Sequence, residues 1–108
     1  MKNKNYQERV FEVTQLIPKG RVSTYGLIAD YLHLGSARMV GWALNKSLLS
    51  NGVPAHRVVN RKGELSGRNF FPSPTMMQEL LENEGVEIKD SKVQDFKDLR
   101  WDPSTELT

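Results

Sequence analysis

Side chains that could carry out covalent chemistry are few in this sequence. It contains no cysteine and only two histidines, His33 and His56, which lie in different sequence contexts. Without a thiol the chain has no disulfide, no thiolate metal site and no cysteine nucleophile. Two separated histidines do not predict a structural zinc site, so we expect neither a metal nor a cofactor.

Positive charge is concentrated in the first three quarters of the chain. Residues 1–81 carry 11 Lys or Arg and 5 Asp or Glu, a net charge of +6. Residues 82–108 carry 4 Lys or Arg and 8 Asp or Glu, so this acidic C-terminal segment has a net charge of −4. A basic face of this kind fits a polyanionic partner. Charge alone favours the simpler interpretation, a solvated surface with an acidic tail.

The chain is long enough for one small domain, and we expect residues 1–108 to form it, with a core from about residue 6 to residue 101. No apolar run approaches the roughly 20 residues of a membrane helix, and no signal peptide is visible. We therefore expect a cytoplasmic protein, nucleoid-associated if prokaryotic, without a membrane partner. Apolar residues at helical spacing predict a first helix over residues 5–17, which Pro18 and Gly20 end.

A helix-turn-helix is predicted next. A second helix is expected over Tyr25–Leu32, and Ser23 or Thr24 can cap it. A third helix is expected over Ala37–Ser47, capped by Ser36. Two short helices joined by a brief turn are typical of this motif.

The connection and the outer face of the third helix have a distinctive composition. Gly35, in the connection, is available for the left-handed conformation. The outer face carries few charges, and its residues are Arg38, Gly41, Trp42 and Asn45. A helix built only for solubility would carry more charge there. Small residues on this face permit a close approach to a partner backbone.

The second half is predicted to contain a β-hairpin, an irregular basic loop and a last helix. Strands over residues 58–60 and 64–66 would flank the basic turn at residues 61–63. After a loop over residues 66–72, Ser73 can cap a helix that has Pro74 at its first position, extends to about Glu84 and stops at Gly85.

The end of the chain has no regular pattern, but its large apolar residues are expected to pin it to the core. These residues are Val93, Phe96, Leu99 and Trp101. The fold class is therefore mainly α with a small β-hairpin, an α+β domain with a winged-helix-like core.

Several segments together resemble the O6-alkylguanine-DNA alkyltransferases. Residues 54–59, Pro-Ala-His-Arg-Val-Val, are similar to the family's active-site signature, Pro-Cys-His-Arg-Val-Val. Residues 20–26 resemble the segment that opens its helix-turn-helix, residues 37–44 its recognition helix, and residues 83–86 the segment after the active site. The segments occur in the family's order and spacing. The resemblance implies the fold of the family's C-terminal DNA-binding domain.

The active-site cysteine is where this chain departs from the family. Ala55 stands at the position of the thiolate that takes the alkyl group from guanine O6. Alanine has no nucleophilic atom, so alkyl transfer cannot occur there. Proteins of this build with the cysteine replaced are the alkyltransferase-like proteins, most of which carry Trp at this position. His56 and Glu84 match the family's base and the carboxylate that orients it. Both residues are retained, although there is no thiol for them to activate.

The resemblance places the helix-turn-helix in the minor groove of DNA. Arg38 matches the arginine finger that fills the gap left by a flipped base, and Tyr25 matches a tyrosine that crowds the target phosphate. Trp42 would either pack on the sugar-phosphate backbone or fill a gap in the core. The expected DNA contacts are Thr24, Tyr25, Ser36, Ala37, Arg38, Gly41, Trp42, Asn45 and Arg61, with Lys62 as a further phosphate contact.

A pocket for the flipped guanine is expected between the loop at residues 54–59 and the loop at residues 66–71. Arg68 replaces the family's usual tyrosine and puts a positive charge near the lesion, and the family's helix-end asparagine aligns with Ser47. The methyl group of Ala55 leaves space that predicts tolerance of bulkier O6 adducts. The expected pocket residues are Tyr25, Leu44, Pro54, Ala55, His56, Val58, Leu65, Arg68 and Asn69.

The sequence thus predicts a monomeric, non-enzymatic protein that binds O6-alkylguanine in duplex DNA by base flipping and hands the lesion to nucleotide excision repair. Two alternatives remain open. A helix-turn-helix regulator of undamaged DNA would need a polar recognition helix in the major groove. An enzyme would need another nucleophile, or water activated by His56.

Overall fold

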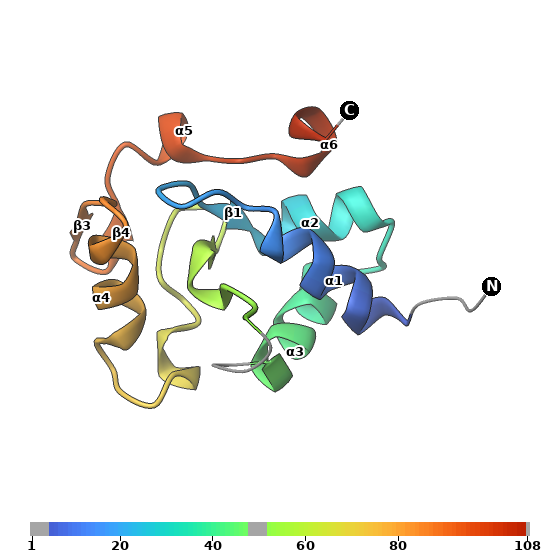
Figure 1. Cartoon of the computed structure of the whole chain (residues 1–108), viewed down its shortest axis with the longest axis horizontal. Helices are drawn as coiled ribbons and strands as arrows, with labels where there is room; N and C mark the ends of the chain where they lie inside the picture. The colour runs from blue at the N-terminus through green and yellow to red at the C-terminus, as the bar shows by residue number, and fades with distance from the viewer. Residues whose placement is uncertain (1–4, 48–51, 108) are drawn as a thin grey trace.

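The computed structural model describes residues 5–47 and 52–107, and shows helices packed around short strands (Figure 1). The strands are β1 (Ser23–Thr24), β2 (Val58–Val59), β3 (Ile88–Lys89) and β4 (Lys92–Val93). The helices are α1 (Tyr6–Gln15), α2 (Tyr25–Leu32), α3 (Ala37–Ser47), α4 (Met76–Asn83), α5 (Phe96–Leu99) and α6 (Pro103–Glu106). Two 3-10 turns complete the order, η1 (Ala55–Arg57) and η2 (Arg68–Phe70). The mainly α, α+β class is confirmed, and no described helix is long and apolar enough to cross a membrane.

Helix α1 supplies one wall of the core. The Asn5 side chain caps it by accepting a hydrogen bond from the Glu8 amide at 2.9 Å. Val10 and Val13 are buried, because the apolar positions recur at helical spacing. The helix ends at Gln15, two residues before the predicted end, and the chain turns through Gly20, which has a φ of +84°.

The predicted helix-turn-helix is present as α2 and α3, which pack against each other and against α1. Thr24 caps α2 by accepting a hydrogen bond from the Leu27 amide at 3.0 Å. The expectation for Gly35 is wrong, because His33 takes the left-handed conformation with a φ of +56°. The chain therefore turns at the residue directly after α2, before it reaches the glycine.

The predicted hairpin over residues 58–60 and 64–66 is wrong. Strand β2 pairs in parallel with β1, with Ser23 opposite Val58 and Thr24 opposite Val59. Both valines are fully buried, as is usual for a parallel strand that is covered on both faces. The basic turn does form, held by the Asn60 side chain, which accepts hydrogen bonds from two turn amides. The residues after the turn pair with the segment around β4 instead.

The hairpin of this molecule lies later in the chain, at β3 and β4, which pair antiparallel. Asp90 and Ser91 connect the strands with φ values of +55° and +59°. Two positive φ values are the requirement of a type I′ turn, which usually contains glycine. Because Asp-Ser carries a weaker turn signal, the sequence did not predict this hairpin.

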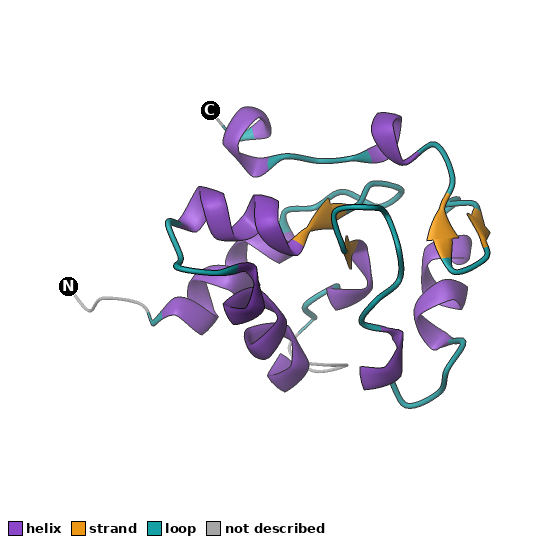
Figure 2. Ribbon diagram, turned by 180° about the vertical axis from the view of Figure 1, so that it is seen from behind, coloured by secondary structure: helices purple, strands orange, loops and turns teal. Residues whose placement is uncertain are grey.

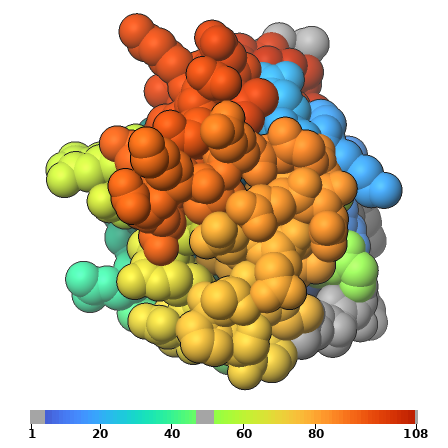
Figure 3. All heavy atoms as spheres, turned by 90° about the vertical axis from the view of Figure 1, so that its left-hand side faces the viewer, coloured from blue at the N-terminus to red at the C-terminus, as the bar shows by residue number. Residues whose placement is uncertain are grey.

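Helix α4 begins later than predicted, at Met76 with Thr75 as its N-cap residue. The expected cap at Ser73 with Pro74 in the first turn is wrong, since these residues lie in the preceding bends. The predicted stop is confirmed at Gly85, which has a φ of +88°. Figure 3 shows that α4 and the β3–β4 hairpin cover this end of the molecule.

The last part of the chain returns across the molecule to β1 (Figure 2). Val22 forms a parallel bridge with Arg100, and the Trp101 amide donates to the Val22 carbonyl at 2.7 Å. Trp101 and Val93 are buried, and Phe96 packs on the core, so the prediction that these residues pin the chain end is confirmed. The same contacts hold the residue before β1, and with it the start of the helix-turn-helix.

Candidate functional site

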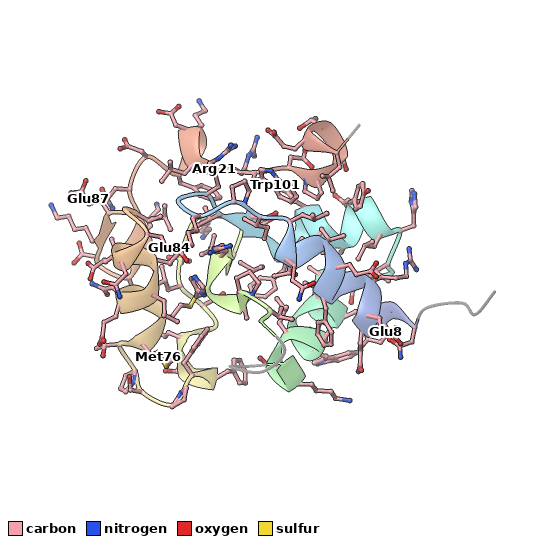
Figure 4. All side chains as sticks on the ribbon, viewed as in Figure 1. Glu8, Arg21, Met76, Glu84, Glu87 and Trp101 are labelled. Atoms are coloured by element: carbon pink, nitrogen blue, oxygen red, sulfur yellow. The ribbon has the colours of Figure 1, made fainter. Side chains whose placement is uncertain are left out.

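A buried network of charges fixes the loop that contains Ala55. Arg57 donates from Nε and Nη2 to the two carboxylate oxygens of Glu84, at 2.9 and 2.7 Å. Its Nη1 donates to the Ile17 carbonyl at 2.8 Å. His56 Nε2 lies 2.9 Å from Glu84 Oε2, and each of the three side chains is only 11–12% exposed. Figure 4 labels Glu84 at the inner side of α4. We call these three residues the Glu84 network; it ties η1 to the C-terminal end of α4 and to the segment that follows α1.

The protonation states in the Glu84 network follow from its geometry. Burial opposes the charged form of Glu84, but the hydrogen bonds from Arg57 and His56 outweigh it and hold the pKa of Glu84 below its usual value. Burial also lowers the pKa of His56, despite the nearby carboxylate. A neutral His56 beside an ionised Glu84 carries its hydrogen on Nε2 and keeps a lone pair on Nδ1. The ring is thus prepared as a base, but the methyl group of Ala55 offers nothing to deprotonate.

A hollow of about 280 Å³ lies against Ala55, and we call it the Ala55 hollow. Its lining residues are Gly52, Val53, Pro54, Ala55, His56, Phe71 and Leu80. It contains three of the expected pocket residues. Phe71 and Leu80 were not among the predicted residues; the only sequence signal was the paired phenylalanines of the basic loop.

The other expected pocket residues lie elsewhere. The side chains of Leu44, Val58 and Leu65 are buried in the core and support the site from behind. Arg68 folds back on its own loop, with Nη1 donating to the Leu65 carbonyl at 3.1 Å, and Asn69 is exposed beside it. The side chain of Ser47 lies outside the described part of the structure.

A second hollow, of about 350 Å³, lies between α3 and η2, and we call it the α3 hollow. Its lining residues are Tyr25, Ala37, Arg38, Gly41, Trp42, Asn45 and Phe70. Six of them are expected DNA contacts, so the structure brings these residues to one surface. Trp42 is 54% exposed and therefore does not fill a core gap. Phe70 lines the same hollow and was not predicted.

A third hollow, of about 380 Å³, contains the basic turn, and we call it the turn hollow. Its lining residues are Tyr25, Gly26, Ala37, Asn60, Arg61, Lys62 and Glu64. It shares Tyr25 and Ala37 with the α3 hollow, so the two hollows lie next to each other. Arg61 and Lys62 are exposed near the first residues of α2, where the helix dipole adds positive potential. Ser36, at the start of α3, is exposed, whereas Thr24 is buried as the α2 cap.

Tyr25 joins these surfaces to the loop at residues 66–71. Burial raises the pKa of the Tyr25 hydroxyl, although a hydrogen bond with Ser66 partly offsets this effect. The hydroxyl lies so close to Gly67 that a Cβ there would be 2.7 Å from it. Only glycine fits at this position without a shift of the ring. The loop is therefore packed directly onto the tyrosine.

Comparison with known proteins connects this geometry with DNA. Residues 5–86 match the family described as the 6-O-methylguanine DNA methyltransferase, DNA binding domain. The alkyltransferase-like protein 1 of Schizosaccharomyces pombe is 35% identical over 108 residues, which cover 95% of this chain and all of that protein. The DNA base-flipping protein of Escherichia coli is 35% identical, over 93% of this chain and 77% of its own length. The crystal structure of S. pombe Atl1 in complex with damaged DNA containing O6-carboxymethylguanine matches with a TM-score of 0.80 at 34% identity, over 95% of this chain and 100% of that one.

Proposed function

The chain belongs to the family of the 6-O-methylguanine DNA methyltransferase DNA-binding domain, and we propose that it recognises O6-alkylguanine in duplex DNA without removing the alkyl group. The helix-turn-helix docks in the minor groove, and the modified base rotates out of the stack into the Ala55 hollow. Base flipping costs roughly a few kcal/mol, because stacking and base pairing are lost. Contacts in the pocket and from Arg38 offset this cost.

One observation carries this proposal: expected binding residues gather on one surface, while the nucleophile is missing. The α3 hollow gathers Arg38, Trp42 and Tyr25 on one surface, and the Glu84 network holds the neighbouring loop. At the place of the thiolate stands the methyl group of Ala55, which lines its own hollow. A site with this composition can hold a base, and Ala55 can form no bond to its alkyl group.

The Ala55 hollow supports a wide adduct range. A methyl group in place of a thiol leaves more room beside the O6 substituent, and the wall formed by Phe71 and Leu80 is apolar. We expect affinity to rise as the substituent grows beyond methyl. Titrations with duplexes that carry O6-methyl- or O6-benzylguanine measure this directly, and equal or weaker binding of the larger adduct would contradict it.

The central experiment combines binding with a chemical readout. The protein is titrated against two matched duplexes, with guanine or O6-methylguanine at one position, and the DNA is then analysed by mass spectrometry. We expect a preference for the lesion and unchanged DNA. Removal of the alkyl group would mean that His56 or another group acts as a catalyst. Equal affinity for both duplexes would favour a regulator that reads undamaged DNA.

A bound protein that does no chemistry helps repair only if another system acts next. We propose that nucleotide excision repair receives the marked lesion, and that the protein works as a monomer in the cytoplasm, at the nucleoid if it is prokaryotic. Loss of this protein should then sensitise cells to alkylation only when nucleotide excision repair is intact. Equal sensitisation in excision-deficient cells would oppose the hand-off.

A further inference from the structure

A further hollow, of about 210 Å³, lies against α2, and we call it the α2 hollow. Its lining residues are Thr24, Gly26, Leu27, Asp30, Arg61 and Arg100. It shares no lining residue with the Ala55 hollow or with the α3 hollow. The α2 hollow is therefore separate from the two hollows that the proposed function assigns to the lesion and to the recognition helix.

Two arginines from distant parts of the chain meet at the α2 hollow. Arg61 lies in the basic turn after β2, and Arg100 lies in the returning segment that forms the bridge with Val22. Arg100 is beyond residues 5–86, which match the DNA-binding domain of the family. Part of this hollow is thus built by a segment to which the family match assigns no role.

Both guanidinium groups are available for a ligand. Arg61 and Arg100 are exposed, and in the described part of the chain neither side chain forms an ion pair or donates a hydrogen bond. The backbone beside them is fixed, because Arg21 donates to the Leu99 and Arg100 carbonyls at 3.0 and 2.9 Å. Arginine presents several N–H donors in one plane, an arrangement that fits the oxygens of a phosphate.

Positive charge continues from the recognition helix to the α2 hollow. The turn hollow lies next to the α3 hollow, and it shares Gly26 and Arg61 with the α2 hollow. Arg38, Arg61 and Arg100 therefore supply one cation or more to each of three neighbouring hollows. A DNA strand carries a negative charge at every phosphate, so a strand that passes from α3 over the basic turn can reach Arg100.

One carboxylate opposes the two arginines of the α2 hollow. Asp30 is exposed, and in the described part of the chain it forms no ion pair with either arginine. Two arginines and one aspartate leave the lining with a net charge of +1. A bound phosphate would be attracted by Arg61 and Arg100 and repelled by Asp30. Substitutions of opposite sign should therefore change affinity in opposite directions.

We propose that the α2 hollow binds a backbone phosphate of duplex DNA beside the lesion, and that Arg100 thereby extends the DNA contact beyond the helix-turn-helix. The inference rests on the proposed binding of DNA. It is independent of lesion recognition, because a backbone phosphate carries no information about the O6 substituent. Arg100 should therefore strengthen binding to damaged and undamaged duplexes by the same factor.

Three substitutions and one matched control test the phosphate contact. Arg100→Gln removes the positive charge, Arg100→Lys keeps it, and Asp30→Asn removes the opposing charge. The control is Lys97→Gln, because Lys97 is exposed on α5 and does not line the α2 hollow. Thermal denaturation checks that all variants fold. Each is titrated against the guanine and the O6-methylguanine duplex between about 50 and 200 mM salt.

We expect Arg100→Gln to weaken binding to both duplexes about fivefold at the lowest salt and to reduce the slope of log Kd against log salt by about 1. Arg100→Lys should keep most of the affinity, and Asp30→Asn should raise it for both duplexes. Lys97→Gln should leave the slope unchanged. An unchanged slope in Arg100→Gln, or an equal reduction in Lys97→Gln, would overturn the phosphate site.

Duplex length shows whether the phosphate belongs to DNA. Shortening the duplex from one end should reduce the affinity of the wild type to that of Arg100→Gln, without further loss in the variant. If shortening from neither end does so, the proposed contact is wrong. A lesion preference that persists beside a negative result would leave the proposed function intact. The expected effects of Arg100→Gln without any lesion preference would refute the proposed function and retain the phosphate site.

Discussion

The Glu84 network and the α3 hollow belong to one candidate site, but their charged groups differ. Those of the network are buried and paired, whereas Arg38 in the α3 hollow is exposed to solvent. In the network, Arg57 and His56 have partners within 3 Å, and little of any side chain reaches solvent. In the α3 hollow, Arg38 is exposed, and aromatic rings face water. A saturated network can hold a loop in shape but has few groups left for a ligand. The open hollow has unused binding groups, so we expect stability to depend on the first region and affinity on the second.

The strongest test of this comparison removes the carboxylate of the network. Glu84→Ala leaves the buried Arg57 without its partner, so the free energy of unfolding should fall by about 3 kcal/mol. Urea denaturation measures the loss. Glu87→Ala is the matched control: Glu87 is exposed just beyond α4 (Figure 4), and its removal should change stability by less than about 0.5 kcal/mol. Equal losses for both variants would show that the network is not a special support.

Arg38→Ala should produce the opposite pattern. Because Arg38 is exposed, the free energy of unfolding should change by less than about 0.5 kcal/mol. Affinity for the lesion duplex should fall by about 2 kcal/mol, roughly 30-fold, if the guanidinium fills the space of the flipped base. Lys89→Ala on β3 makes the same change of charge at a position remote from α3 (Figure 1). A similar loss of affinity in that control would mean that Arg38 contributes only a general electrostatic attraction to DNA.

Arg68 belongs neither to the Glu84 network nor to the lining of the α3 hollow, and its effect should be intermediate. Its hydrogen bond to the Leu65 carbonyl holds the charged group within the loop beside Asn69. Arg68→Ala should lower the preference for O6-methylguanine over guanine about fivefold, the equivalent of about 1 kcal/mol, with less effect on undamaged DNA. Parallel titrations of the two duplexes measure the ratio. Equal weakening for both would remove Arg68 from lesion discrimination.

The pH dependence of stability should give the smallest effect. The folded pKa of His56 is lowered by burial below its ordinary 6.5, so the unfolded chain binds a proton first as the pH falls. The free energy of unfolding should therefore decrease as the pH falls below about 6.5. The lowered pKa of Glu84 continues the decrease at more acidic pH. His56→Gln should flatten the first part of the curve, and an unchanged curve would mean that His56 does not cause it.

Sequence patterns predicted the four longer helices, α1 to α4, because these depend on local spacing, whereas the short helices α5 and α6 were not predicted. The apolar stripes of α1 and α3, the Thr24 cap and the Gly85 stop are local features of this kind. The pairing of β2 with β1 was not predictable in this way. Two buried valines carry no information about which distant strand they join.

The sequence also did not predict that the site is divided into two hollows. Family resemblance placed Tyr25 and Ala55 in one pocket, and the structure puts Tyr25 on a different hollow from Ala55. Phe70 and Phe71 are adjacent in the chain, and only their backbone geometry decides that they line different hollows. Arg57 illustrates the same limit, because its bonds to Glu84 cross from one element to another.

The bridge between Val22 and Arg100 has a consequence for the order of folding. It joins the residue that precedes the helix-turn-helix to a segment near the end of the chain, and Trp101 closes the core beside it. Contacts between residues so distant in sequence form slowly, because a long loop must close first. During synthesis, the recognition helices would emerge long before the segment that completes their support. A nascent chain would thus acquire its full affinity for DNA only after Arg100 and Trp101 have been synthesised and have packed against Val22.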